Sequence, residues 1–144
     1  MTEQNFSNHS KYVPAFHFFA APALIINFGW SIYRLIHFGF SLDGCIAVLT
    51  AAALLLAILL ARSFAVKVQD RVIRLEERLR MQQLLPDDLK SRIPEFTCGQ
   101  LIALRFASDA ELPALARKVL AEKVVTSKGI KQMIQTWRPD HLRA

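Results

Sequence analysis

The sequence predicts an all-α membrane protein, a hairpin of two transmembrane helices whose long second helix continues into a small cytoplasmic helical tail. Two apolar runs, residues 13–36 and 45–61, stand next to each other and are joined by a short link at residues 37–44. After residue 61 the sequence becomes charged but keeps a helical period, and no segment alternates as a strand does. One apolar run would also suit the core of a soluble protein, but two adjacent runs in 144 residues favour membrane spans.

We expect three segments: a polar interfacial N-terminus at residues 1–12, the hairpin at residues 13–66, and the cytoplasmic tail at residues 67–144. The first span, about residues 13–36, would extend ~36 Å at ~1.5 Å per residue, which exceeds the ~30 Å hydrocarbon layer. The second span, about residues 44–66, is long enough if the arginine near its end extends its charge toward the headgroups.

Aromatic and proline residues mark the start of the first span. Tyr12 and Phe16 begin an aromatic cluster of the kind found where a span enters the headgroup zone. Pro14 suits the first turn of a helix, where its missing N–H has no partner to lose. Pro22 lies deeper and can kink the span, which membrane helices tolerate.

Each predicted span carries a stripe of small and polar residues along one side. Small residues allow helix backbones to approach closely, and polar groups in a membrane seek partners. We therefore expect the two stripes to face each other or to face copies in an oligomer. Arg34 and Asp43, which flank the link, are expected to pair. The predicted helix-packing residues are Ala20, Ala23, Asn27, Ala47, Ala51, Ala57 and Ala61.

The stripe of the second span continues beyond the predicted membrane. Ala65, Val68, Val72, Leu75 and Leu79 follow it at spacings of 3 and 4, so one helix is predicted from about residue 43 to residue 84. This seam is similar to a coiled coil, but it lasts only about two heptads. Packing against the protein's own tail is the favoured interpretation.

Basic residues just past the second span predict the topology of the chain. The positive-inside rule places this side in the cytoplasm, so both termini are expected there, and the cluster can attract anionic lipid. Acidic residues interrupt the cluster, with Asp70–Arg74 and Glu76–Arg80 as predicted ion pairs. No continuous phosphate-binding stripe results, so nucleic acid is not an expected partner despite a net charge of +6. The cluster comprises Arg62, Lys67, Arg71, Arg74, Arg78 and Arg80.

Capping signals divide the tail into short helices. Thr97 with Gln100 predicts a capping box, Ser108 with Glu111 predicts another helix start, and Ser127 can cap a last helix. The expected helices cover about residues 87–93, 101–106, 108–124 and 128–137. Their apolar positions can form one core, namely Leu101, Leu104, Leu112, Leu115, Val119, Leu120, Ile130, Met133, Ile134 and Trp137.

His17 and His37 are the candidate cofactor ligands, because a histidine on a membrane helix can bind haem iron or a chlorophyll magnesium. Twenty residues apart on one helix, they cannot bind the same metal, so a cofactor would need a second chain. Interfacial or packing roles explain them without one, and we expect no cofactor and no metal site. Cys45 and Cys98 should lie on different sides of the membrane and remain unpaired.

The sequence offers no enzyme signature. It has no glycine-rich phosphate loop and no arrangement typical of a nucleophile and its base. No carboxylate lies in the middle of either span, which argues against a proton-carrying rotor or an acid-lined cation pore. The chain is expected not to be an enzyme.

Residues 4–18, residues 100–113 and the Ile130-Lys131-Gln132 triplet followed by Trp137 resemble an uncharacterised family of small bacterial two-span membrane proteins. The resemblance covers both ends of the chain. It implies membership without a mechanism, because the family has no assigned activity. It also implies that the stretch 105–113 and an interfacial motif belong to the shared design. That motif consists of Asn8, His9, Pro14 and His17.

Together these observations predict a non-catalytic protein of the bacterial inner membrane, an accessory or scaffold subunit of a membrane complex or of a homo-oligomer. A small oligomeric channel or transport component is the alternative, since channels also use this architecture. A pigment- or haem-binding subunit is a further alternative that rests on His17 and His37.

Overall fold

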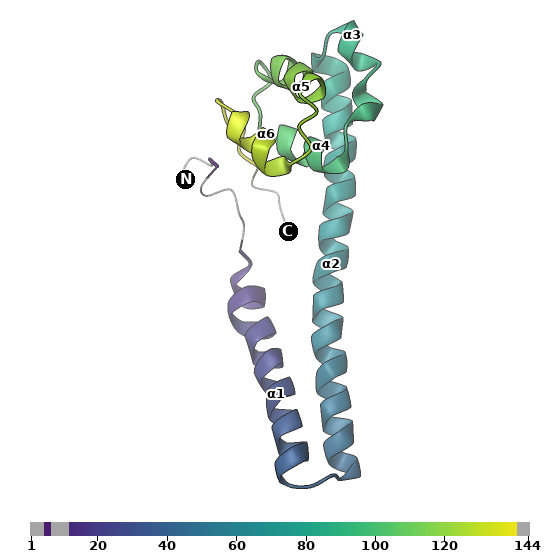
Figure 1. Ribbon diagram of the computed structural model, residues 1–144, viewed down its shortest axis with the longest axis vertical. Coiled ribbons are helices and arrows are strands. Elements are labelled where there is room, and N and C mark those ends of the chain that lie inside the picture. The colour runs from purple at the N-terminus through teal and green to yellow at the C-terminus, as the bar shows by residue number, and fades with distance from the viewer. Residues whose placement is uncertain (1–4, 7–11, 141–144) are drawn as a thin grey trace. The chain divides into compact units, whose positions relative to one another are not determined.

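The computed structural model describes residues 5–6 and 12–140, and it confirms the all-α class (Figure 1). Within this part of the chain the only bridge of β type is an isolated antiparallel one between Ala107 and Trp137. Two helices, in η1–α1 and in α2, are long and apolar enough to cross a membrane. The elements are η1 Ala15–Ala20, α1 Ala21–His37, α2 Leu42–Leu84, α3 Asp87–Lys90, η2 Ile93–Glu95, α4 Cys98–Leu104, α5 Leu112–Ala121 and α6 Ser127–Met133.

The described chain divides into two compact units within α2, between Val66 and Lys67. The hairpin unit holds η1, α1 and the first part of α2. The C-terminal unit holds the rest of α2 and α3 to α6. As the sequence predicts, α2 is one long helix, from Leu42 to Leu84.

Pro22 shapes the start of the hairpin unit. In a regular α-helix its ring would clash with the carbonyl of Phe18. The chain instead forms a π-helix over η1, in which the Ala21 N–H binds the Phe16 carbonyl, and the α-helix begins at Ala21. The predicted kink at Pro22 is therefore realised as a change of helix type one turn earlier.

The link between the two apolar helices is a tight turn. Gly39 has φ of +90°, a conformation that side chains rarely adopt. The Ser41 hydroxyl accepts a hydrogen bond from the Gly44 N–H at 3.1 Å and so caps the start of α2. A Cβ at Gly44 would lie 2.8 Å from Leu35 Cδ1, so the helices meet closely at this point because residue 44 is a glycine.

The hairpin buries a different face of α1 from the predicted one. Leu24, Phe28 and Leu35 share one side of the helix and are half-buried, whereas the predicted packing residues are mostly exposed. Contacts with copies of the chain stay a prediction for those exposed residues. Ala51 is buried, Ala20 is half-buried, and Ala23, Asn27, Ala47, Ala57 and Ala61 are exposed.

The predicted ion pair between Arg34 and Asp43 is not formed in the described hairpin. Both residues instead line a polar cavity of about 550 Å³ near the link, together with Asn27, Ser31 and Thr50.

In the C-terminal unit the short helices lie beside the last turns of α2 (Figure 1), and together they form an apolar core of buried side chains. Met81, Leu101, Leu104, Phe106 and Leu112 are fully buried at its centre. All ten predicted core residues lie in this cluster, seven of them buried and three packed against it. The sequence therefore predicted the tail core correctly.

The helix caps of this unit agree with the prediction at one position and differ at two. Thr97 and Gln100 form the predicted capping box. The Ser108 hydroxyl accepts from the Glu111 N–H, but α5 starts only at Leu112. Thr126, not Ser127, caps α6, because the Ser127 hydroxyl donates to the Gly99 carbonyl at 2.8 Å and ties α6 to α4. The helix α5 therefore starts later than predicted, and it ends at Ala121; α6 starts one residue earlier than predicted but ends already at Met133.

The expectation that the seam packs against the protein's own tail is wrong. The core contacts a different side of α2, through Ile73, Glu77, Met81 and Leu85. The seam remains exposed, because the connection at Pro86 brings the short helices back against the other face of the helix. Within the C-terminal unit the residues of the seam are Val68, Val72, Leu75 and Leu79, with exposed fractions of 61, 49, 61 and 58%.

Candidate functional site

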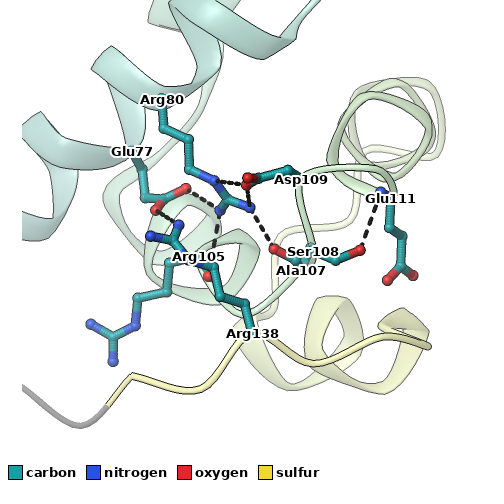
Figure 2. Close-up of polar contacts among 8 residues, drawn as sticks. All are labelled: Glu77, Arg80, Arg105, Ala107, Ser108, Asp109, Glu111 and Arg138. Carbon is teal, nitrogen blue, oxygen red and sulfur yellow. Dashed lines mark hydrogen bonds and ion pairs between the residues drawn. The ribbon is translucent and has the colours of Figure 1, made fainter.

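A network of ion pairs joins α2 to the loops of the C-terminal unit, with Arg80 at its centre (Figure 2). Its guanidinium donates to Asp109 Oδ1 at 2.8 Å, to Glu77 Oε2 at 3.1 Å and to the Ala107 carbonyl at 2.6 Å. Arg80 thus holds the turn between α4 and α5 against α2. The planar, multiply donating guanidinium suits this role in a way that a lysine ammonium would not.

Glu77 is the buried carboxylate of the network, with only 5% of the residue exposed. It lies one turn before Arg80 and also faces Arg138, whose Nη1 is 3.9 Å from Oε1. Burial raises the pKa of Glu77, and the nearby charges of Arg80, Arg138 and Arg105 partly oppose that shift. The carboxylate therefore depends on its arginine neighbours to stay ionised.

Arg105 is the second buried cation of the site. It follows α4 directly, is 5% exposed, and places Nη1 3.3 Å from Asp140 Oδ2. Its guanidinium also stacks over the Phe106 ring, 4.6 Å from the centroid, which provides a cation–π contact.

Backbone bonds align the segments that carry these charges. The Arg138 N–H donates to the Phe106 carbonyl at 2.7 Å, next to the isolated bridge between Ala107 and Trp137. The Glu111 carboxylate accepts from the N–H groups of residues 135 and 136 at 2.9 and 3.0 Å. This second role of Glu111 explains why it does not complete a capping box with Ser108.

A groove of about 980 Å³ runs beside this network along α2. One wall is the helix, with Val72, Glu76 and Leu79, and the other is formed by the segment 138–140 and by Arg105. The residues that line the groove include the charged groups of the network and the apolar seam residues Val72 and Leu79. The groove is therefore a surface where an apolar helix with charged flanks could lie.

The chemistry of the network favours a structural role. Three guanidinium groups face three carboxylates, and their hydrogen bonds and ion pairs join α2 to the α4–α5 turn and to the segment after Trp137. Across residues 5–6 and 12–140, no group of histidine, cysteine and acidic residues is arranged to hold a metal ion. This arrangement can hold the short helices of the C-terminal unit on one face of α2.

The two candidate ligand histidines lie at opposite ends of the η1–α1 segment. Val13 donates its N–H to His17 Nδ1 at 3.1 Å, and the Tyr12 and Phe16 rings contact the imidazole edge-on. His37 is exposed and lies 4.3 Å from the Tyr33 ring, centroid to centroid. Each histidine thus has a packing or capping role, and the chain does not bring them together.

The other predicted site residues are also separated. Pro14 precedes η1 at its N-cap, whereas Asn8 and His9 lie outside the described residues. In the basic cluster, Arg80 is drawn into the buried network, and its predicted partner Glu76 is replaced by Glu77. Arg62 lies over the Phe16 ring, at 5.8 Å from the centroid. Lys67, Arg71 and Arg74 are exposed, and Arg78 is half-buried.

Sequence reasoning missed Glu77, Arg105, Asp109, Arg138 and Asp140. A signal for Glu77 was present, because Ile73, Glu77 and Met81 follow one another at a spacing of four and place a carboxylate inside an apolar stripe. The other four lie outside the helices and could not be paired with Glu77 or Arg80 before the fold was known.

The fold and site together define an all-α protein with two candidate membrane spans and a helical unit held by a buried ion-pair network. Residues 1–144 match DUF6526, described as a family of unknown function, and the chain belongs to this family. The resemblance to an uncharacterised family is thereby confirmed. No curated protein and no solved structure matches the chain.

Proposed function

We propose that the protein is a non-catalytic scaffold of the bacterial inner membrane, working as a homo-oligomer or as a subunit of a larger membrane complex. The hairpin would anchor the chain, and the C-terminal unit would offer helical surfaces in the cytoplasm. The observation that carries the proposal is the distribution of exposed apolar side chains.

Large exposed apolar residues are concentrated in the two long helices. Among the described residues they lie between Tyr12 and Leu79, with Val125 as the single exception. Ile26 and Leu49, for example, are 71 and 70% exposed. Leaving such a side chain in water instead of an apolar environment costs about 1.5–3 kcal/mol. A bilayer would remove that cost for the hairpin, which supports the membrane assignment.

Charge supports the proposed orientation. Lys67, Arg71 and Arg74 are exposed on α2 directly after the apolar segment, whereas residues 38–42 of the link carry no charge. Insertion favours basic residues on the cytoplasmic side. Both termini would then be cytoplasmic, and the exposed basic residues would be available to anionic headgroups.

Impermeant thiol labelling in bacterial spheroplasts tests anchoring and orientation together. In a chain with Cys45→Ala and Cys98→Ser, we would introduce either Ser41→Cys in the link or Lys128→Cys in the C-terminal unit, both at exposed positions. Ser41→Cys should react from outside in sealed cells, and Lys128→Cys only after lysis. Recovery of the chain in the soluble fraction, or the reverse labelling pattern, would refute the proposal.

The hairpin cavity favours one alternative function, a small channel or transport component. Asn27, Ser31, Thr50, Arg34 and Asp43 provide polar groups on facing helices within this cavity of about 550 Å³. Several copies could join such cavities into a path. Conductance of the purified chain in liposomes, lost on Asn27→Leu, would support this alternative, and sealed liposomes would argue for the scaffold.

A further inference from the structure

The seam of α2 is a continuous apolar surface that the C-terminal unit leaves uncovered. Val68, Val72, Leu75 and Leu79 follow each other at spacings of four, three and four, and each is at least 49% exposed. The core of the unit closes without them, since the residues that α2 contributes to that core lie on another side of the helix. An apolar stripe of this kind beside a closed core indicates a binding surface.

We propose that this seam binds the same seam of a second copy as a short parallel, in-register coiled coil. In heptad notation Val72 and Leu79 occupy a positions, and Val68 and Leu75 occupy d positions. Val72 at a and Leu75 at d fit the pattern that favours two strands, whereas Val68 at d and Leu79 at a reverse it, so the charges beside the seam decide the arrangement. The inference rests on the proposed membrane function, which gives every copy the same orientation.

The charges beside the seam are complementary between two parallel copies. Arg71 falls at g and Glu76 at e, and in a parallel pair a g residue faces the e residue five positions ahead in the partner. Both side chains are exposed, and neither has an ion pair within residues 12–140. Two copies would therefore form two Arg71–Glu76 pairs, one on each side of the seam.

The same charges disfavour an antiparallel pair. In that arrangement g faces g and e faces e, so Arg71 would approach the basic g residues of the other helix, including Arg78. Like charges placed opposite each other destabilise the wrong arrangement and so select the partner's direction.

Membrane anchoring compensates for the short length of the seam. Two heptads would form a weak coiled coil between free peptides. When both chains are held in one bilayer in one orientation, the effective concentration of the second seam rises and a weak contact can become populated. The groove beside the seam leaves room for the second helix, since Val72 and Leu79 line its helix side.

Disulfide trapping in membranes tests the register. In the chain with Cys45→Ala and Cys98→Ser, Val68→Cys and Leu79→Cys mark the two ends of the seam, and Arg74→Cys marks an exposed position away from it. Disulfides form when Cα atoms are about 4.4–6.8 Å apart, so Val68→Cys and Leu79→Cys should each give homodimers on oxidation and Arg74→Cys should not. Crosslinks only between a Val68→Cys chain and a Leu79→Cys chain would show an antiparallel pair and overturn the inference.

Charge exchange tests the ionic pairs. Arg71→Glu and Glu76→Arg, each combined with Val68→Cys, should lower the crosslinked fraction roughly fivefold, and the double exchange should restore it. Arg74→Glu changes the net charge by the same amount as Arg71→Glu but lies away from the seam, so it should have little effect. Equal losses for Arg71→Glu and Arg74→Glu, or no recovery in the double variant, would exclude these pairs.

The failures of the two proposals are distinguishable. If the chain resists alkaline extraction from membranes but neither Val68→Cys nor Leu79→Cys forms homodimers, the self-pairing inference is wrong and the scaffold proposal stands. If the chain is extracted as a soluble protein, the membrane function is wrong whether or not the crosslinks form.

Discussion

Two faces of α2 in the C-terminal unit have opposite environments although both carry apolar residues. One face contributes Ile73, Met81 and Leu85 to the core, and it also carries the charged Glu77. The other face, the seam, is apolar at each of its four positions and is exposed. The more polar face is therefore the buried one. This difference shows that hydrophobicity alone does not decide which face of a helix its own chain covers.

The ion-pair network accounts for the choice of face. Arg80, which is paired with Glu77, donates hydrogen bonds to Asp109 and to the Ala107 carbonyl in the turn after α4, and the seam has no group that could do so. Buried charges add little net stability, but they penalise arrangements in which they lose their partners. We infer that the network selects the docking face, while the apolar core supplies most of the stability.

The largest expected effect is a loss of stability that distinguishes the buried face of α2 from the seam. Met81→Asp places a charge in the core, where the residue is 0% exposed, and should destabilise the C-terminal unit by about 4 kcal/mol or more. Leu79→Asp, two residues earlier but 58% exposed, should leave the unit folded. Unfolding can be followed through Trp137 fluorescence of the full chain in detergent, with Trp30→Phe removing the other tryptophan. Similar losses for both variants would contradict the assignment of faces.

A smaller loss of stability is expected when Arg80, at the centre of the network, is replaced. Arg80→Ala leaves the Glu77 carboxylate without its nearest cation and removes the bond to the Ala107 carbonyl, which should cost about 3 kcal/mol. Arg74→Ala, an exposed position on the same helix, should stay within about 0.5 kcal/mol of the parent. The same fluorescence measurement compares them. Equal free energies of unfolding for Arg80→Ala and Arg74→Ala would show that the network has no structural importance.

The smallest expected effect is a change in the free energy of unfolding with pH. Burial raises the pKa of Glu77 above its ordinary value of 4.5, so the folded chain binds this proton more tightly than the unfolded chain does. The resulting stabilisation is fully present below 4.5 and is lost as the pH rises through the raised pKa. The free energy of unfolding of the parent, relative to Glu77→Gln, should therefore fall as the pH rises above this value.

The comparison with Glu77→Gln separates the contribution of Glu77 from those of carboxylates whose pKa is lowered in the folded chain. Lys90 lowers the pKa of Asp87, and Arg92 lowers that of Glu95, so their contributions are lost as the pH falls. The contributions of Asp87 and Glu95 are the same in the parent and in Glu77→Gln, so they cancel when the two free energies of unfolding are subtracted. A difference that stays constant with pH would mean that Glu77 is not perturbed by burial.

Local signals predicted much of the fold. The capping box at Thr97 and Gln100 needs only residues that are three apart, and it was found. The ten apolar core residues of the tail follow from helical spacing and were also found. The starts of α5 and α6 were misjudged because Glu111 and Ser127 bind residues 24 to 28 positions away. Competition from such distant partners cannot be read from a local motif.

The sequence by itself determined which segments are helical, because periodicity, prolines and capping residues act within a few positions of one another. It also determined that the chain has two long apolar helices. Only the tertiary structure decided which face of α2 is covered and which charges are buried. Arg105 and Asp109 come from a part of the chain far from Glu77 and Arg80, and Arg80 could have paired with Glu76 as well as with Glu77. The choice depends on where the turn after α4 returns to the helix, since an ion pair stabilises only at contact distance.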